Sequence, residues 1–187
     1  MKISIYLGVI LIGGCAYLTY LQHPFTEIPN FHQVDEYLFR GGRPKEEGFR
    51  KLASLGIKTL ISLKEDERKI GQDKRRASGL GFKFYNIPLS VYKMPTDNDV
   101  FKFLEIVLNK ENQPVFVYCS NGKDRVGAMV ALYRVVVCGW QPKQAYKEAK
   151  HFGFWPYYGE AELKKFIHQL KDKKIYFEKA REYLRGS

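Results

Sequence analysis

The chain has 187 residues, of which 45% are hydrophobic and 27% are charged, and its formal net charge is +11 at pH 7. This composition excludes a disordered, collagen-like or low-complexity protein. When an apolar N-terminal segment is set aside, about 160 residues remain, which is enough for one domain but not for two.

That first segment, residues 3–21, carries no charge, and a lysine precedes it. A run of roughly 19 apolar residues is long enough to cross a bilayer, and the lysine favours an N-terminus in the cytoplasm. We therefore expect an apolar membrane-anchor helix or signal segment in residues 1–25, and a domain of residues 26–187 that faces the periplasm or the cell exterior. The stretch from Ile12 to Cys15 is also similar to a bacterial lipoprotein cleavage site, so lipidation of the cysteine is the alternative anchor.

The rest of the chain alternates strand-like apolar runs with amphipathic helical patterns. The apolar runs lie at residues 36–39, 59–63, 82–87 and 115–118. The alternation predicts an α/β fold with a mainly parallel central sheet of about four to five strands and helices on both faces. The ligand site of such a sheet lies beyond the carboxyl ends of its strands.

Several local patterns refine this fold. Residues 40–44, Arg-Gly-Gly-Arg-Pro, predict a turn that leads into a helix. Residues 126–138 are apolar nearly all round and end at a glycine, so we expect a central buried helix there. Further helices are expected from Pro142 onward, including a lysine-rich amphipathic tail over residues 160–184.

A nine-residue segment between the last apolar strand and the buried helix carries the chemistry. It reads Cys119-Ser120-Asn121-Gly122-Lys123-Asp124-Arg125-Val126-Gly127. Backbone N–H groups in such a connection converge on a phosphate, and the positive end of the helix dipole adds to the attraction. We expect phosphate to be bound by Ser120, Asn121, Gly122, Lys123, Val126 and Gly127, while the planar guanidinium of Arg125 matches two phosphoryl oxygens at once.

The cysteine at the head of this segment is the expected nucleophile. A thiol at a helix N-terminus beside a cation is more acidic than a free one, so Cys119 is expected to be a thiolate at neutral pH. A thiolate in line with phosphorus displaces the leaving oxygen and forms a phosphocysteine, which water then hydrolyses. The sequence therefore predicts a phosphatase, with Arg125 stabilising the transition state.

The spacing of cysteine, five residues and arginine resembles the signature of the cysteine-dependent protein tyrosine and dual-specificity phosphatases. Residues 37–44 and 56–63 are similar to the first strand and turn, and to the Gly-Ile-Lys-Thr strand, of bacterial and atypical dual-specificity members. The resemblance implies their fold and phosphocysteine chemistry, with no cofactor and no metal. It implies a phosphotyrosine or phosphoserine/threonine protein, or a phosphoinositide or other lipid phosphate, as substrate.

Two residues depart from the family pattern. Tyr118 stands where the family usually has histidine, and Val126 stands where it usually has a hydroxyl residue. In the family that hydroxyl assists departure of the thiolate from phosphocysteine, so the second step is expected to be slow. A catalytically weak or inactive relative that only binds phosphate is therefore the alternative function.

Three aspartates compete for the role of general acid. Most family members carry it on the loop whose counterpart here, residues 90–93, has no carboxylate. Asp97 and Asp99 come next, but capping the following helix is the stronger interpretation of both. Asp124 directly precedes the arginine and resembles an aspartate of myotubularin-like lipid phosphatases, so it is the preferred candidate.

The remaining charge and side chains narrow the expected partners. The net positive charge suits acidic substrates or an anionic membrane surface. The expected contact with the membrane is through residues 3–21. Lys123 either attracts substrates with more than one phosphate or is a solvated cation. No nucleic acid is expected, because that function does not fit an outward-facing anchor, and the scattered histidines predict no metal site.

Overall fold

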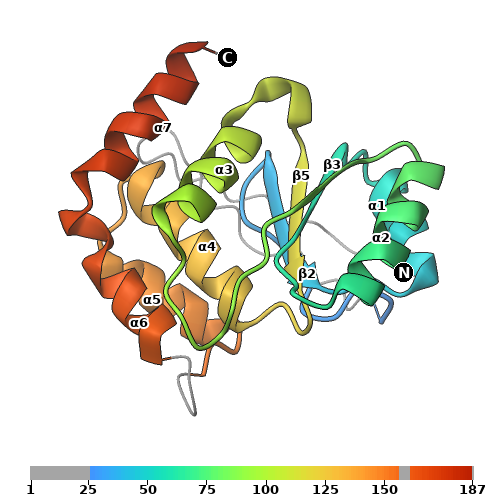
Figure 1. Cartoon of the computed structure of the whole chain (residues 1–187), viewed down its shortest axis with the longest axis horizontal. Coiled ribbons are helices and arrows are strands. Elements are labelled where there is room, and N and C mark those ends of the chain that lie inside the picture. Colours follow the sequence, from blue (N-terminus) through green and yellow to red (C-terminus); the bar gives the residue numbers. More distant parts are fainter. Residues whose placement is uncertain (1–25, 156–160, 187) are drawn as a thin grey trace, which may run out of the picture.

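The computed structural model describes residues 26–155 and 161–186 (Figure 1). They contain a five-stranded sheet with the strand order β1-β2-β5-β3-β4. β1 pairs antiparallel with β2, and all other neighbouring strands are parallel. The strands are β1 (His32–Gln33), β2 (Leu38–Gly42), β3 (Thr59–Ser62), β4 (Lys83–Asn86) and β5 (Val115–Cys119). The expected mainly parallel sheet is confirmed, whereas the expected anchor lies outside the described residues.

Helices cover both faces of the sheet, as expected (Figure 1). On one face, α1 and α2 enclose an apolar core that includes Phe49, Leu60 and Phe116. The other helices enclose a larger core around α4 on the opposite face. The helices are α1 (Glu46–Ser54), α2 (Glu67–Gly79), α3 (Asp97–Leu108), α4 (Asp124–Val136), α5 (Pro142–His151), α6 (Ala161–Gln169) and α7 (Lys174–Gly186).

Helix α4 is the buried helix that the sequence predicts. Every residue from Val126 to Val136 is buried. The apolar sequence pattern and the buried position of this helix agree, because a helix that is apolar all round must be enclosed by other elements. The helix begins at Asp124, so the connection between β5 and α4 is shorter than the apolar pattern alone indicates.

Residues 40–42 correct one expectation, because they continue β2 instead of forming a turn. Their backbone pairs with β5, and Gly42 lies opposite Cys119. A Cβ on Gly41 would stand 2.9 Å from the Phe116 ring, so this strand needs glycine for close packing. The glycines therefore indicate close approach between strands, which the local pattern does not distinguish from a turn.

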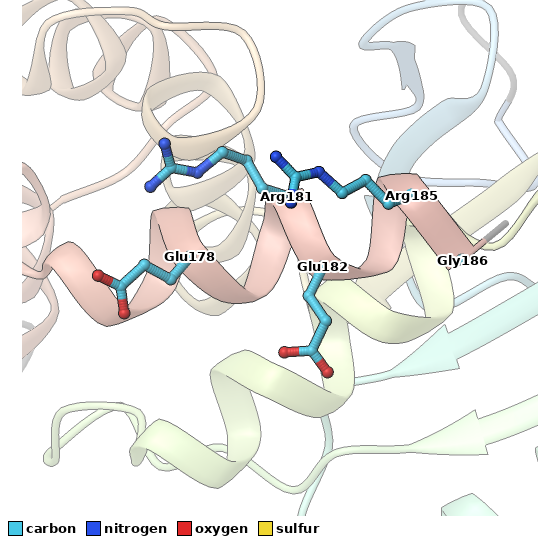
Figure 2. A pocket seen from close by; sticks show the side chains of 5 residues that line it. All are labelled: Glu178, Arg181, Glu182, Arg185 and Gly186. Atoms are coloured by element: carbon cyan, nitrogen blue, oxygen red, sulfur yellow. The ribbon is translucent and has the colours of Figure 1, made fainter.

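Outside this core, the last helix carries a surface groove. It is lined by Glu178, Arg181, Glu182, Arg185 and Gly186 of α7 (Figure 2). Figure 1 shows this end of α7 at the opposite side of the molecule from the connection between β5 and α4. Among residues 26–155 and 161–186, no helix is long and apolar enough to cross a membrane.

Candidate functional site

The connection between β5 and α4, residues 119–125, is called the phosphate loop below. Its tightest point is Gly122, which has a φ of +71°. A Cβ at this residue would stand 2.4 Å from backbone atoms of Gly41 and Gly42. Only glycine fits such a conformation and such an approach, so the loop packs directly on the end of β2.

Cys119 ends β5 and begins the phosphate loop. It is a free thiol, and the residue is only 3% exposed. The thiol therefore stands between the carboxyl edge of the sheet and the N-terminus of α4, where the helix dipole contributes positive potential. This position suits the role of nucleophile that the sequence predicts for Cys119.

Among residues 26–155 and 161–186, the hydrogen-bond partners of Arg125 are neutral oxygen atoms. Its Nη1 donates to the carbonyl oxygens of Leu63 and Leu89, both at 3.3 Å. Its Nη2 donates to Ser120 Oγ at 3.2 Å. Within the described residues Arg125 forms no ion pair with a carboxylate, so its charge is not neutralised locally and can act on a bound anion.

Two carbonyl groups of the phosphate loop are held from outside it. The Arg43 backbone N–H donates to the Ser120 carbonyl oxygen at 3.2 Å. The Gly122 carbonyl oxygen accepts from Arg40 Nη2 at 3.0 Å and from Asn30 Nδ2 at 2.8 Å. The end of β2 and the segment before β1 thus fix the orientation of two loop peptides.

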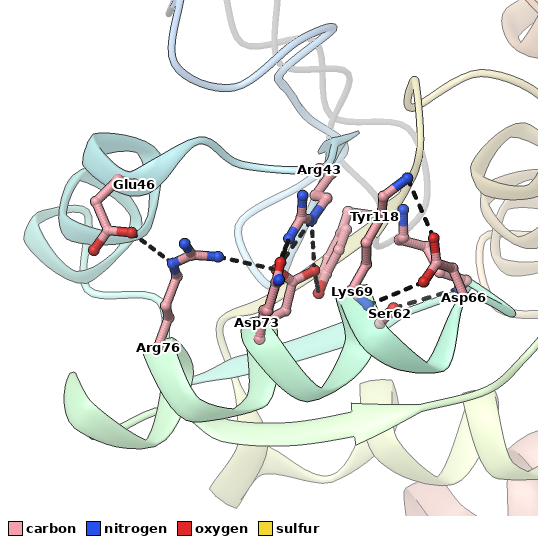
Figure 3. A network of polar contacts seen from close by, with 10 residues as sticks. Arg43, Glu46, Ser62, Asp66, Lys69, Asp73, Arg76 and Tyr118 are labelled. Atoms are coloured by element: carbon pink, nitrogen blue, oxygen red, sulfur yellow. Dashed lines mark hydrogen bonds and ion pairs between the residues drawn. The ribbon is translucent and has the colours of Figure 1, made fainter.

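A buried polar network lies beside the strand that leads into the loop (Figure 3). Arg43 Nε and Nη2 donate to the Asp73 carboxylate, the shortest contact being 2.7 Å to Oδ1. The Tyr118 hydroxyl donates to Asp73 Oδ2 at 3.0 Å. Burial, and next the Asp73 charge, raise the pKa of Tyr118, so the phenol stays a donor at neutral pH. This hydrogen bond therefore links Tyr118, the residue before Cys119, to α2.

The three candidate acids have different surroundings. Asp124 is half-buried, its Oδ1 accepts the Trp155 backbone N–H at 3.0 Å, and its Oδ2 has no hydrogen-bond partner among the described residues. Asp97 Oδ1 accepts the Tyr176 hydroxyl at 2.7 Å, which joins α3 to α7. Asp99 forms a capping box with Thr96. Asp97 and Asp99 thus hold α3 in place, and Asp124 is the one that belongs to the phosphate loop.

The residues expected to bind phosphate fall into two groups by exposure. Ser120, Asn121 and Lys123 are exposed, whereas Gly122, Val126 and Gly127 are buried. The Lys123 side chain lies against Gly153, where a Cβ would stand 3.2 Å from Lys123 Cδ. Across the part of the chain that the structure describes, no group of three or more His, Cys, Asp or Glu residues could hold a metal ion.

Sequence reasoning missed three residues around the loop, namely Asn30, Arg40 and Asp73. Arg40 and Asp73 are 1% and 0% exposed, and both make polar contacts with residues far away in the chain. A signal was available for Arg40, because a charged residue in a strand with apolar neighbours is costly unless it has partners. No local signal marks Asp73, which lies in a helix rich in charged residues.

Residues 24–163 match the protein family described as DSP-PTPase phosphatase fused to NAD+ kinase. The chain belongs to this DSP-PTPase family. The resemblance drawn from the cysteine-to-arginine spacing is therefore confirmed at the level of the family.

Individual relatives agree with this assignment. The dual specificity protein phosphatase TpbA of Pseudomonas aeruginosa is 30% identical over 134 residues, which cover 67% of this chain and 55% of that protein. The inositol diphosphatase SIW14 of Saccharomyces cerevisiae is 31% identical over 131 residues, covering 67% of this chain and 46% of that protein. The chain thus spans about half the length of the curated relatives it matches.

Solved structures share the fold. The crystal structure of TpbA superimposes with a TM-score of 0.70 at 22% identity, covering 85% of this chain and 96% of that one. The core catalytic domain of the PP-IP phosphatase SIW14, in complex with citrate, gives a TM-score of 0.70 at 25% identity, with coverages of 83% and 94%. The sheet and helices described above are therefore those of a dual-specificity-type phosphatase domain.

Proposed function

We propose that this protein is a phosphatase that hydrolyses phosphate monoesters through a phosphocysteine on Cys119. The observation that carries the proposal is the pairing of a free, buried thiol with an arginine at the two ends of one loop, where the described partners of the arginine are neutral oxygens. An anion placed between them meets uncompensated positive charge from the guanidinium and from the N-terminus of α4. Membership of the DSP-PTPase family supports the same chemistry.

In the first step the Cys119 thiolate attacks phosphorus. The new S–P bond forms as the bond from phosphorus to the leaving oxygen breaks, and the leaving oxygen takes a proton from Asp124 Oδ2. Arg125 and the loop N–H groups bind the three equatorial oxygens while charge redistributes over them. Asp124 suits the role because its Oδ1 is fixed by the Trp155 N–H, which leaves Oδ2 for the proton.

In the second step water hydrolyses phosphocysteine. Asp124, now ionised, accepts a proton from the water as its oxygen bonds to phosphorus, and the S–P bond breaks to return the thiolate. Val126 supplies no hydroxyl to assist this departure. We therefore expect breakdown of phosphocysteine to limit turnover.

The substrate remains one of two classes. TpbA is named a dual specificity protein phosphatase, and SIW14 is named an inositol diphosphatase. The first name supports a phosphorylated protein as substrate, and the second supports a phosphorylated inositol. A phosphoinositide carries such an inositol headgroup, so it is proposed here together with other lipid phosphates. The exposed Lys123 at the loop favours ligands with additional negative charge.

The full chain in detergent micelles provides the test. Phosphate release from p-nitrophenyl phosphate, a phosphotyrosyl peptide and a panel of phosphoinositides is compared for the wild type and for Cys119→Ser. The proposal predicts release by the wild type on at least one substrate and none by the variant. Phosphate affinity without release by either protein would instead support a phosphate-binding relative, and release by the variant would exclude the thiol as nucleophile.

We also propose that residues 3–21 tether the domain to a membrane. Their length and lack of charge support this placement. The test is fractionation of cells that express the full chain or a chain starting at residue 26. Recovery of both proteins in the same soluble fraction would contradict the tether.

A further inference from the structure

Behind the phosphate loop, a buried arginine on β2 contacts the loop backbone. Arg40 is 1% exposed, and its Nη2 donates to the Gly122 carbonyl oxygen at 3.0 Å. Its guanidinium carbon lies 4.6 Å from the centre of the Phe152 ring, at the end of α5. Burying a guanidinium is costly. The contact of this buried cation with the loop backbone therefore raises the question of its role there.

Asn30 contacts the same carbonyl. Its Nδ2 donates both to the Gly122 oxygen at 2.8 Å and to the Phe152 oxygen at 2.9 Å. Its Oδ1 lies 3.1 Å from His32 Nε2, and because an amide oxygen only accepts, the histidine proton is on Nε2. Burial, and next the Arg40 charge, lower the pKa of His32 to about 4, so the ring is neutral at physiological pH. The orientation of the Asn30 amide is thereby fixed.

These contacts decide which way one loop peptide faces. In a planar trans peptide the C=O and the following N–H point in opposite directions. Because the Gly122 oxygen is turned toward Arg40 and Asn30, the Lys123 N–H points away from these two residues. Glycine readily adopts more than one backbone conformation, so the loop sequence alone does not impose this orientation.

We propose that Arg40 and Asn30 are positioning residues that hold the Gly122 carbonyl away from the bound phosphate and so present the Lys123 N–H to it. This inference rests on the proposed function. Without the two donors, the carbonyl is free to turn inward and bring its negative end toward the phosphate and the Cys119 sulfur. Arg40 also adds a fixed positive charge behind the loop.

The chain provides a matched control at the other end of α4. Arg134 is 4% exposed, donates to the Val34 carbonyl oxygen at 3.0 Å, and places its guanidinium carbon 4.5 Å from the Trp140 ring centre. It thus has the burial, the carbonyl contact and the ring contact of Arg40, but its carbonyl belongs to another part of the chain. It also pairs with the Glu148 carboxylate at 2.9 Å, so its replacement is expected to cost more stability than loss of the carbonyl contact alone. Replacing Arg134 tests for loss of stability alone.

The experiment uses the full chain and two readouts that need no turnover. The rate of iodoacetamide alkylation of Cys119 at pH 6 is followed by peptide mass spectrometry, and protection by inorganic phosphate gives the phosphate affinity. For Arg40→Met we expect alkylation to be about tenfold slower and phosphate affinity about tenfold weaker, from the loss of a charge-assisted hydrogen bond and of a buried cation. Asn30→Gly, which tolerates the φ of +51° at this residue, is expected to weaken phosphate binding about threefold to tenfold.

Arg134→Met is expected to lower the melting temperature and to leave both readouts unchanged. If Arg40→Met does not fold, Asn30→Gly decides the matter. Wild-type alkylation and phosphate affinity in Asn30→Gly, or equal losses in the Arg40 and Arg134 variants, would overturn the inference. Because neither readout requires hydrolysis, a failure of the proposed phosphatase activity would be recognised separately.

Discussion

The two ends of α4 each carry an arginine, and the two arginines have different kinds of hydrogen-bond partner. Near the C-terminal end, Arg134 Nη2 donates to Glu148 Oε1 at 2.9 Å, and the side chains are 5% and 9% exposed. At the N-terminal end, Arg125 contacts two carbonyl oxygens and one hydroxyl, and no carboxylate among the described residues. Within the described part of the chain, a carboxylate neutralises Arg134 and none neutralises Arg125.

This difference separates a structural charge from a functional one. A buried ion pair satisfies its own charge and leaves nothing for a ligand. Neutral oxygens orient a guanidinium without cancelling its charge, so Arg125 stays attractive to an anion that arrives from solvent. The direction of the helix reinforces the contrast, because the N-terminal end of α4 is its positive end.

The largest effect on activity is expected from Arg125→Lys, which keeps the charge and removes the planar guanidinium. We expect kcat to fall by about a hundredfold to a thousandfold, as when one donor to a transition state is lost. Phosphate affinity should fall less, because an ammonium still attracts the anion. Steady-state kinetics and phosphate inhibition measure the two effects, and an unchanged kcat would show that the planar guanidinium has no role.

The other end of the helix gives a loss of stability instead. Arg134→Met leaves Glu148 buried without its partner and should cost about 3 kcal/mol of unfolding free energy. The double variant Arg134→Met with Glu148→Leu should recover most of that loss, because no unpaired charge remains. Urea titration measures stability, and kcat of the folded variants should match the wild type. A drop in kcat in both variants would contradict the division between the two ends.

Asp124→Asn tests whether a second residue at the N-terminal end of α4 acts as the general acid. The amide keeps the shape and removes the proton, so kcat/KM on a phosphoserine peptide, which covers the steps up to release of the alcohol, should fall by about a hundredfold. The loss on p-nitrophenyl phosphate should be smaller, because nitrophenolate leaves with little need for protonation. Equal, small losses on both substrates would assign Asp124 to holding the Trp155 N–H and would return Asp97 and Asp99 to consideration.

The smallest effect is expected from Tyr118→Phe, which removes one hydroxyl from the Asp73 network. Stability should fall by about 1 kcal/mol, since Arg43 still satisfies the carboxylate. Turnover should fall only a few-fold, through looser placement of Cys119. Thermal unfolding and kcat measured on the same preparations provide the check. Full wild-type turnover would mean that this contact stabilises the fold without positioning the thiol.

The sequence could predict those features of the molecule that are determined by residues close together in the chain. The apolar run of β5, the glycine-containing loop and the apolar helix α4 follow one another directly, so their order places Cys119 and Arg125 at the two ends of one loop. The parallel sheet follows from the alternation of apolar runs and amphipathic helices. These features need no knowledge of distant residues.

The parts that sequence could not predict depend on distant contacts. Arg40 and Gly122 are 82 residues apart in the chain, and Tyr118 and Asp73 are 45 apart. The glycines beside Arg40 indicate a turn when only their neighbours are considered. Only the packing of the phosphate loop against β2 shows that they belong to a strand.

The most direct test of the account is chemical trapping of the intermediate. The full chain is mixed with p-nitrophenyl phosphate, quenched in acid within the first turnovers, and digested for peptide mass spectrometry. We expect one added phosphoryl group on the peptide that contains Cys119, which accumulates because Val126 offers no hydroxyl for its breakdown, and no such group in Cys119→Ser. Product release without any phosphoryl group on that peptide, at quench times shorter than one turnover, would contradict it.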